Sequence, residues 1–267
     1  MPDIQQPTDD VLYQVQDGIA RVTFNRPQSR NAMLFSMYER LAEICAEIEA
    51  DRSIRVLVLT GAGEKAFAAG TDISQFRAFK TPEDALGYEA RIDRVLGALE
   101  RVRVPTIAAS AGACTGGGAG MAACCDLRIA ASNLRFGFPV ARTLGNCLSM
   151  SNYARLVALI GPAKVKDMVF TARLVEADEA RAIGLVSEVL PDPAALMARA
   201  DELARLVAAN APLTLRATKE ALRRIKERSL AEGDTDKDLI LMCYMSADFR
   251  EGMDAFLTKR PPVWKGE

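Results

Sequence analysis

Hydrophobic residues along the chain follow two spacings, one typical of strands and one of helices. Short apolar runs bounded by turn residues predict strands at Val11–Gln16, Ile19–Phe24, Val56–Leu59, Thr106–Ser110, Leu127–Ala131 and Leu185–Val189. Asp17-Gly18 lies between the first two runs and predicts a hairpin turn. Apolar residues at helical spacing predict two helices in the first half of the chain, at Met33–Ala50 and Asp84–Val102.

The second half of the chain is predicted to be mostly helical. The helices expected there are Ala154–Ile160, Ala163–Phe170, Glu176–Ala182, Pro193–Ala209, Leu213–Arg228 and Thr235–Phe256. Strands that alternate with helices indicate an α/β core with parallel strand pairing. We therefore expect a core over residues 1–195, in which a strand–strand–helix theme recurs two or three times, and a helical region over residues 196–267.

The charge balance and one missing residue type restrict the chemistry. The chain of 267 residues has 34 Lys and Arg against 35 Asp and Glu, and it contains no histidine. Near-zero net charge disfavours a nucleic-acid partner, which usually meets a basic face. Without histidine, Ser-His-Asp and Cys-His nucleophile activation and most zinc sites are excluded, and we expect no metal. Proton transfer must use carboxylates, tyrosine, cysteine, lysine, water or backbone groups.

The cysteines and the uncharged segments suggest an ordinary cytoplasmic protein without a membrane partner. The cysteines have no C-x-x-C spacing and are expected to be buried reduced thiols: Cys45, Cys114, Cys124, Cys125, Cys147 and Cys243. Residues 1–10 are polar and acidic and do not resemble a signal peptide. The longest uncharged run, Val104–Cys125, contains Pro105 and five glycines, which favours a strand, a glycine loop and a helix start over a membrane span.

A glycine-rich loop over Ser110–Gly120 follows one predicted strand and opens a helix. Such a junction presents free backbone N–H groups, and glycines let a ligand approach the backbone closely. The loop therefore predicts an anion or oxyanion site, although close packing of helix on strand would explain the same glycines. A P-loop is excluded because no lysine follows the glycines, and the spacing of Gly116, Gly118 and Gly120 does not fit a dinucleotide fingerprint.

A second turn, over Ala66–Ile73, follows the strand that begins at Val56. Gly70 allows a tight turn there, and Thr71 would begin the next element. Two such turns after neighbouring parallel strands can aim two N–H groups at one oxygen, as an oxyanion site requires. An ordinary helix N-terminus is the alternative interpretation of this segment.

Five sequence blocks occur in the order typical of one family. They are Phe24–Met33 with Asn-Arg-Pro and Asn-Ala-Met, Phe67–Ile73 with Ala-Gly-Thr-Asp-Ile, Gly112–Ala130 with Gly-Gly-Gly and Cys-Asp, Thr171–Val186 and Glu251–Pro262. Together they resemble the crotonase, or enoyl-CoA hydratase/isomerase, superfamily over nearly the whole chain. The resemblance implies an α/β spiral of ββα units with a helical C-terminal trimerisation region. It also implies an acyl-CoA substrate, no cofactor besides that coenzyme A, and self-association as a trimer or a dimer of trimers.

The resemblance also assigns site residues. It places the thioester oxygen between the backbone N–H groups of Thr71 and Gly117, where each donor is worth about 3 kcal/mol of transition-state stabilisation. The residues that it places along coenzyme A are Arg30 near the phosphates, Ala68, Ala69, Asp72 and Ile73 along the adenine, and Phe256 and Lys259 from the C-terminal region, often of a neighbouring subunit.

The sequence departs from the hydratases of the family at both catalytic glutamates. By resemblance, the first should lie three residues after the middle glycine, where this chain has Gly120. The second should follow the proline of Phe136–Val140, where Val140 and then Ala141 stand. Neither position holds a group that can transfer a proton. Ordinary two-glutamate hydration is therefore not expected.

The segment after Pro139 supplies the candidates for replacement acid/base chemistry, namely Arg142, Asn146 and Cys147. The 4-chlorobenzoyl-CoA dehalogenase of the family places a nucleophilic aspartate near Asn146 or Cys147. Asparagine cannot act in that way, and Cys147 has no base or cation near it in the sequence, other than the cation Arg142, that would lower its pKa. Other carboxylates and phenols could reach the site from the predicted helices, although a surface or packing role is the favoured interpretation of each: Asp72, Tyr88, Glu89, Asp93, Asp236, Asp238 and Tyr244.

Two functions of different classes follow. The first is an acyl-CoA enzyme that works mainly by polarising the thioester, in isomerisation, decarboxylation, retro-aldol cleavage or an unusual hydration. The second is a non-catalytic acyl-CoA-binding homologue that has lost the catalytic carboxylates. An RNA-binding family member would need a lysine-rich face, which the balanced charge disfavours. The sequence favours the enzyme because its oxyanion motif is intact.

Overall fold

The computed structural model describes residues 10–227 and 236–267. The polar N-terminal residues 1–9, and the predicted helix ends at Arg228 and Thr235, lie outside this part of the chain.

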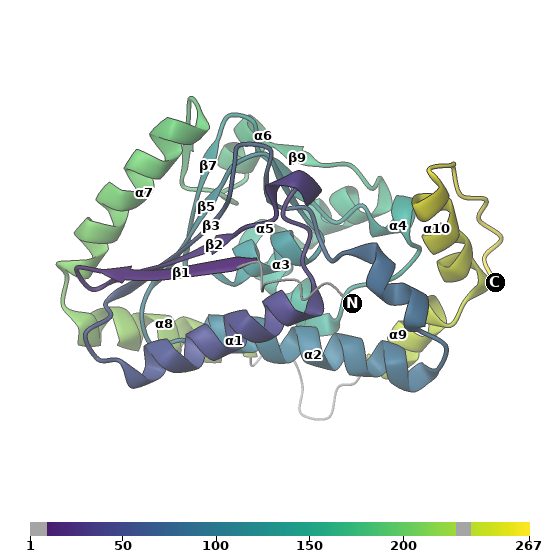
Figure 1. The fold of residues 1–267 in the computed structure, drawn as a ribbon, viewed down its shortest axis with the longest axis horizontal. Helices are drawn as coiled ribbons and strands as arrows, with labels where there is room; N and C mark the ends of the chain where they lie inside the picture. Colours follow the sequence, from purple (N-terminus) through teal and green to yellow (C-terminus); the bar gives the residue numbers. More distant parts are fainter. Residues whose placement is uncertain (1–9, 228–235) are drawn as a thin grey trace, which may run out of the picture.

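Two sheets form the core of the described residues (Figure 1). The six-stranded sheet has the order β1 (Val11–Gln16), β2 (Ile19–Phe24), β3 (Val56–Gly61), β5 (Thr106–Ser110), β7 (Leu127–Ala131) and β10 (Glu188–Leu190). The four-stranded sheet has the order β4 (Ala66–Ala68), β6 (Ala113–Thr115), β8 (Arg135–Gly137) and β9 (Val175–Glu176).

The two sheets are built from a repeating strand–strand–helix unit. In each unit the first strand (β3, β5 or β7) joins the large sheet and the second (β4, β6 or β8) joins the small one. Strands of neighbouring units pair in parallel in both sheets. The predicted α/β class with parallel pairing is therefore confirmed, and so is the predicted hairpin, in which β1 and β2 are antiparallel around Asp17 and Gly18.

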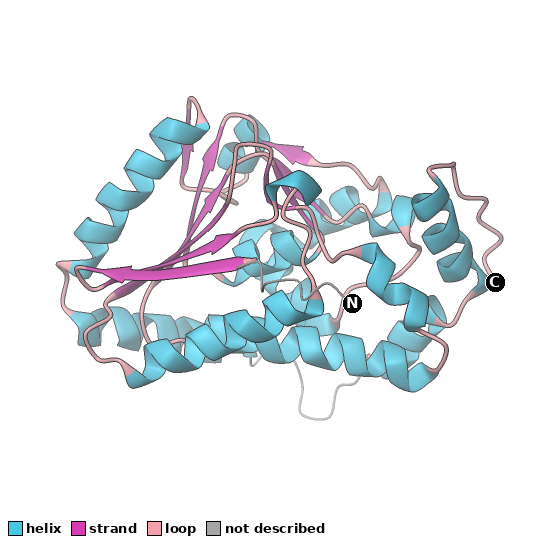
Figure 2. Cartoon of the chain, in the orientation of Figure 1, coloured by secondary structure: helices cyan, strands magenta, loops and turns pink. Residues whose placement is uncertain are grey.

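Helices cover the large sheet on both faces, as Figures 1 and 2 show. α1 (Phe35–Ala50) and α2 (Pro82–Arg101) run side by side, and the predicted stripe of α1, which includes Leu41 and Ile44, is fully buried. On the other face, α7 (Pro193–Ala208) packs Ala200 and Ala204 against the strands. The expected boundary at residue 195 thus falls inside a helix that covers the core sheet.

Two helical segments differ from the sequence prediction. Ala154–Ile160 and Ala163–Phe170 belong to a single α5 (Met150–Phe170), with a kink at Gly161 before Pro162. Conversely, the helix expected over Thr235–Phe256 is divided into α9 (Lys237–Tyr244) and α10 (Ala247–Thr258). The division occurs because the Ser246 hydroxyl accepts the N–H of Phe249 at 2.9 Å and begins a new helix there.

The remaining helices are short or lie at the periphery. They are the 3₁₀ turns η1 (Pro27–Ser29) and η2 (Ile73–Ala78), and the α-helices α3 (Gly117–Cys124), α4 (Val140–Thr143), α6 (Ala177–Ala182) and α8 (Pro212–Glu227). In Figure 1, α9 and α10 lie beside the end of α2 that is far from α7. None of the helices in residues 10–227 and 236–267 combines the length and the apolar composition needed to cross a membrane.

Candidate functional site

Two turns meet at the carboxyl ends of β4 and β6. These strands are parallel neighbours, so the segments that follow them emerge at the same edge of the small sheet. The first turn holds Gly70 and Thr71, and the second holds Gly116 and Gly117. A methyl carbon placed on Gly116 would lie 3.4 Å from the Cα of Gly70, and one on Gly117 would lie 3.5 Å from the Thr71 Oγ1. The two turns are therefore in contact.

The backbone N–H groups of Thr71 and Gly117 are unpaired within the described part of the chain. Thr71 forms a parallel bridge with Met33, in which Met33 N donates to Gly70 O and Asp72 N donates to Met33 O, so the N–H of Thr71 itself is not used. Gly117 is the first residue of α3, where an N–H has no acceptor inside the helix. The positive end of the α3 dipole therefore adjoins both donors.

Glycine is needed at position 117 for packing as well as for access. A methyl carbon there would lie 1.9 Å from the Tyr38 Oη, a distance at which atoms overlap. At Gly118 the same carbon would lie 2.1 Å from the Ala68 carbonyl oxygen. Both explanations that the sequence left open for the glycine loop therefore apply: the helix packs closely on the strand, and its first N–H is left free.

Asn31 holds the first turn in place from the side. Its side chain is fully buried, accepts the N–H of Arg26 at 3.0 Å, and donates to the carbonyl oxygens of Ala62 at 3.0 Å and Ala66 at 2.7 Å. The neighbouring residue Arg30 adds a further bond, because its backbone carbonyl accepts the N–H of Ala69 at 3.1 Å. These bonds fix β4 and therefore the position of the turn that follows it.

Both turns open into one cavity of about 530 Å³. Of the residues predicted for the site, those that line this cavity are Arg30, Ala69, Thr71, Asp72, Ile73, Gly117, Asn146, Cys147 and Phe256. Three others do not line it. Ala68 is fully buried beneath Gly118, and Arg142 and Lys259 are exposed on α4 and after α10.

Two phenols bind the Thr71 side chain. Tyr38 Oη and Tyr88 Oη each lie 2.9 Å from the Thr71 Oγ1. Burial raises the pKa of both phenols well above the usual value, so both remain neutral hydrogen-bonding groups. Sequence reasoning had assigned Tyr88 to packing and did not consider Tyr38. In the structure they anchor α1 and α2 to the first turn.

Glu89 also lines the cavity, contrary to its interpretation as a surface or packing residue. It is 5% exposed, and the Tyr244 hydroxyl donates to its Oε1 at 2.5 Å. The phenol in turn accepts the Asn146 Nδ2–H at 3.0 Å. Among the described residues Glu89 has no ion pair. Burial raises its pKa to about 7, the Tyr244 hydrogen bond opposes that shift, and the nearby carboxylates of Asp93 and Asp236 add to it.

The sequence did contain a signal for Glu89. In α2 the residues Ala85, Glu89, Ile92 and Leu96 recur at helical spacing, and all four are buried. A carboxylate on the apolar stripe of a helix must be paired, protonated or functional. The pattern therefore shows that Glu89 points inward, although it does not show that the space it faces is open.

Cys147 lies in the cavity wall as a neutral thiol. A hydrogen bond with the Cys243 thiol raises the pKa of Cys147, and burial adds to that rise. The same hydrogen bond lowers the pKa of Cys243 to about 7, although burial opposes the shift. A nucleophilic cysteine requires the opposite shift. The other four cysteines are buried free thiols, in line with the sequence.

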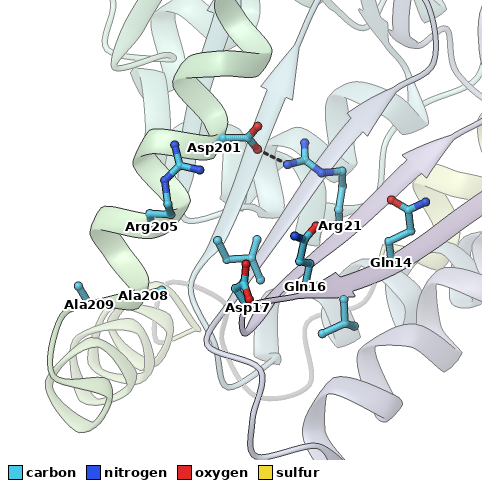
Figure 3. A pocket seen from close by; sticks show the side chains of 10 residues that line it. Gln14, Gln16, Asp17, Arg21, Asp201, Arg205, Ala208 and Ala209 are labelled. Carbon is cyan, nitrogen blue, oxygen red and sulfur yellow. Dashed lines mark hydrogen bonds and ion pairs between the residues drawn. The ribbon is translucent and has the colours of Figure 1, made fainter.

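A second hollow, of about 910 Å³, lies between the β1–β2 hairpin and α7 (Figure 3). Figure 3 shows its polar side chains, including Gln14, Gln16 and Arg205, with Arg21 paired to Asp201. No group of three or more Cys, Asp or Glu side chains in the described ranges is arranged to hold a metal ion.

Comparisons with known proteins converge on one family. The family model described as enoyl-CoA hydratase/isomerase matches residues 14–267. The short-chain-enoyl-CoA hydratase of Clostridium acetobutylicum is 36% identical over 94% of this chain and 95% of its own length. A crystal structure of an enoyl-CoA hydratase/carnithine racemase from Magnetospirillum magneticum is 35% identical, with a TM-score of 0.79 over 97% of both chains. Methylmalonyl-CoA decarboxylase in complex with 2-nitronate-propionyl-CoA is 27% identical, with a TM-score of 0.87 over 96% of this chain and 98% of that one.

Proposed function

Because the chain belongs to the enoyl-CoA hydratase/isomerase family, we propose that it is an acyl-CoA thioester-processing enzyme that stabilises a thioester enolate with the backbone N–H groups of Thr71 and Gly117. The observation that carries the proposal is the contact between two turns, each with an unpaired N–H group, at the wall of one cavity. No cofactor besides the coenzyme A of the substrate takes part.

The physical basis is the movement of charge during enolate formation. When the carbon next to a thioester loses a proton, negative charge develops on the carbonyl oxygen. Donors that are already fixed in position stabilise that charge without reorganising, and each contributes about 3 kcal/mol. Asn31 on one side and the close packing of Gly117 on Tyr38 on the other keep the two donors fixed here.

Coenzyme A would approach from the rim of the cavity. Exposed Arg30 offers a charge for its phosphates, while Ala69, Asp72 and Ile73 form the wall along which its adenine would lie. Phe256 also lines the cavity and is 49% exposed, so it offers an apolar contact at the entrance. Lys259 and Ala68 do not reach the cavity within this chain.

Self-association as a trimer or a dimer of trimers is part of the proposal. It is supported by large apolar side chains that are at least 60% exposed on α8 and α9, namely Leu213, Leu222, Ile225 and Met242. Light scattering after size-exclusion chromatography should give three or six chains per particle. A monomer at micromolar concentration would exclude this part of the proposal.

The alternative, a non-catalytic acyl-CoA-binding protein, is supported by the residues at positions 120 and 140. Gly120 and Val140 stand where the family resemblance places the two hydratase glutamates, and neither can transfer a proton. A carbon placed on Gly120 would lie 3.3 Å from the Leu96 Cδ1 and 3.6 Å from the Asn152 Oδ1, so side chains already pack around this position.

The enzyme and the alternative differ in how they bind an enolate mimic. 2-Nitronate-propionyl-CoA carries negative charge where an enolate carries it, whereas propionyl-CoA is neutral there. If the two N–H groups stabilise that charge, calorimetry should show binding of the nitronate about 100-fold tighter than that of propionyl-CoA. Equal affinities would favour the non-catalytic protein, and no binding of either compound would contradict both functions.

A further inference from the structure

We propose that Glu89 is the catalytic acid/base of this site, and that Tyr244 positions it. This inference rests on the proposed function and assigns the proton carrier that the two missing glutamates leave open. The Glu89 carboxylate would remove a proton from the carbon next to the thioester carbonyl. The C–H electron pair becomes the C=C bond of the enolate, and the carbonyl π electrons move to the oxygen held by Thr71 and Gly117. Return of the proton reverses these movements, so no other reactant is needed.

The first support is that Glu89 and the two donors share one cavity. Glu89 follows Tyr88 on α2, and the Tyr88 hydroxyl lies 2.9 Å from the Thr71 Oγ1. The residue next to Glu89 is therefore hydrogen-bonded to the side chain of Thr71, whose backbone supplies the first donor. Asp72, the other cavity carboxylate on these elements, is instead paired with Arg26 at 3.3 Å and accepts the N–H of Ser74 at 3.2 Å.

The second support is that Glu89 is buried without a counterion among the described residues. An isolated buried carboxylate is costly to a folded protein unless a function retains it. The Tyr244 hydroxyl occupies only one of its two oxygens, and among the described residues no donor occupies Oε2. A carboxylate oxygen with no donor is one that can accept a proton from a ligand in the same cavity.

The third support is the proton affinity of this carboxyl. A general base works best when its pKa lies near the working pH, and burial places that of Glu89 at about 7. The groups around it are Tyr244, Asp93, Asp236, the neutral phenols of Tyr38 and Tyr88, and the Cys147 thiol. None of these is a cation, so nothing among them holds Glu89 permanently ionised.

Asn146 and Tyr244 act as a positioning chain. Asn146 donates to the phenol oxygen, so the phenol must direct its own proton to Glu89. This arrangement stabilises the carboxylate form and fixes its orientation. Tyr244 lies on α9 and Asn146 in the segment before α5, so both wall segments of the cavity hold Glu89 in place.

The test is exchange of the α-protons of butyryl-CoA in deuterated water, followed by mass spectrometry. The wild-type chain should exchange them, and Glu89→Gln should lower the rate at least about 100-fold. Its affinity for butyryl-CoA should stay within a factor of about three. Glu83→Gln, on the exposed first turn of the same helix, is the matched control and should exchange at the wild-type rate.

Tyr244→Phe separates a positioning role from a merely structural one. Loss of the phenol proton should move the inflection of the rate–pH profile to higher pH, because the hydrogen bond lowers the pKa of Glu89. A merely structural role would reduce the rate equally at every pH. A Tyr244→Phe profile with an unmoved inflection would contradict the positioning role.

The outcomes distinguish this inference from the proposed function. If the wild type binds no butyryl-CoA, the proposed function fails. If the wild type exchanges and Glu89→Gln exchanges equally fast while remaining folded by circular dichroism, only Glu89 is excluded. If Cys147→Ala loses the exchange and Glu89→Gln retains it, the Cys147 thiol, rather than Glu89, is the group that removes the proton.

Discussion

Two positions on α2 hold carboxylates in opposite surroundings, which we call the unpaired end (Glu89) and the paired end (Glu100) of the stretch between them. Glu89, two turns into the helix, faces the cavity with a single phenol as its partner. Eleven residues further on, Glu100 pairs with Arg155 at 3.3 Å and with Lys226. Burial raises the pKa of Glu89 to about 7; at Glu100 burial acts in the same direction, but the two cations overcome it and lower the pKa.

The contrast shows that one helix can hold two kinds of buried carboxylate. A carboxylate with cations beside it stays ionised, binds segments of the fold together and has little tendency to move a proton. A carboxylate without such cations contributes little to stability but titrates near neutral pH. Partners, rather than burial alone, therefore decide how Glu89 and Glu100 differ.

Removing a cation from the paired end should have the largest effect on stability. Arg155→Leu leaves Glu100 with one cation and removes the bond from Arg155 to the Asn152 Oδ1 at 3.2 Å. We expect the free energy of unfolding in urea to fall by about 3 kcal/mol. Arg94→Leu breaks the exposed pair between Arg94 on α2 and Glu39 on α1, and it should cost no more than about 0.5 kcal/mol. Similar losses in the two variants would contradict the comparison.

Glu89, at the unpaired end, should make the free energy of unfolding depend on pH. The pKa of Glu89 is about 7 in the folded state, against an ordinary value of 4.5. Between pH 4.5 and 7, Glu89 is therefore protonated in the folded state and ionised in the unfolded state. Stability of the wild type should therefore fall as pH rises from 5 to 8, by up to about 3 kcal/mol relative to Glu89→Gln. Urea titrations at pH 5, 6, 7 and 8 measure this difference. A constant difference across that range would mean that Glu89 does not titrate near neutrality.

Asp93, between the two ends, should give the smallest effect. The Ser149 hydroxyl donates to its Oδ1 at 2.8 Å, and Arg155 is near, yet burial still raises its pKa. Ser149→Ala removes that bond and the N-cap of α5, so we expect a loss of about 1–2 kcal/mol in thermal or urea unfolding. Ser149→Asp would keep the cap but place a second negative charge beside Asp93, and it should be less stable than Ser149→Ala. The reverse order would mean that the cap, rather than Asp93, dominates.

Much of this fold was predictable from local pattern. The stripe through Leu41 and Ile44, the turn at Asp17-Gly18 and five of the six apolar strand runs each depend on neighbouring residues, and the structure confirms them. The last run, predicted at Leu185–Val189, is a strand only over Glu188–Leu190. The break at Ser246 was missed because serine inside an apolar pattern acts as a cap only when the chain turns there.

The site was predictable only in part. The turn pattern after parallel strands predicts that two N–H groups can meet, and the family resemblance names them as those of Thr71 and Gly117; the structure brings the two turns together. Glu89 was not assigned to the site because its partner, Tyr244, is 155 residues away. Helical spacing shows that a residue points inward, whereas the presence of open space beside it depends on contacts between distant segments.

The contact between Gly117 and the Tyr38 phenol constrains the order in which the site can evolve. The phenol oxygen occupies the volume that a β-carbon at position 117 would need. A lineage can acquire alanine at 117 only after position 38 has become smaller, and that earlier step removes the hydroxyl that binds Thr71. A substitution at Gly117 therefore requires a change at Tyr38, and that change removes a hydrogen bond that holds Thr71 in place.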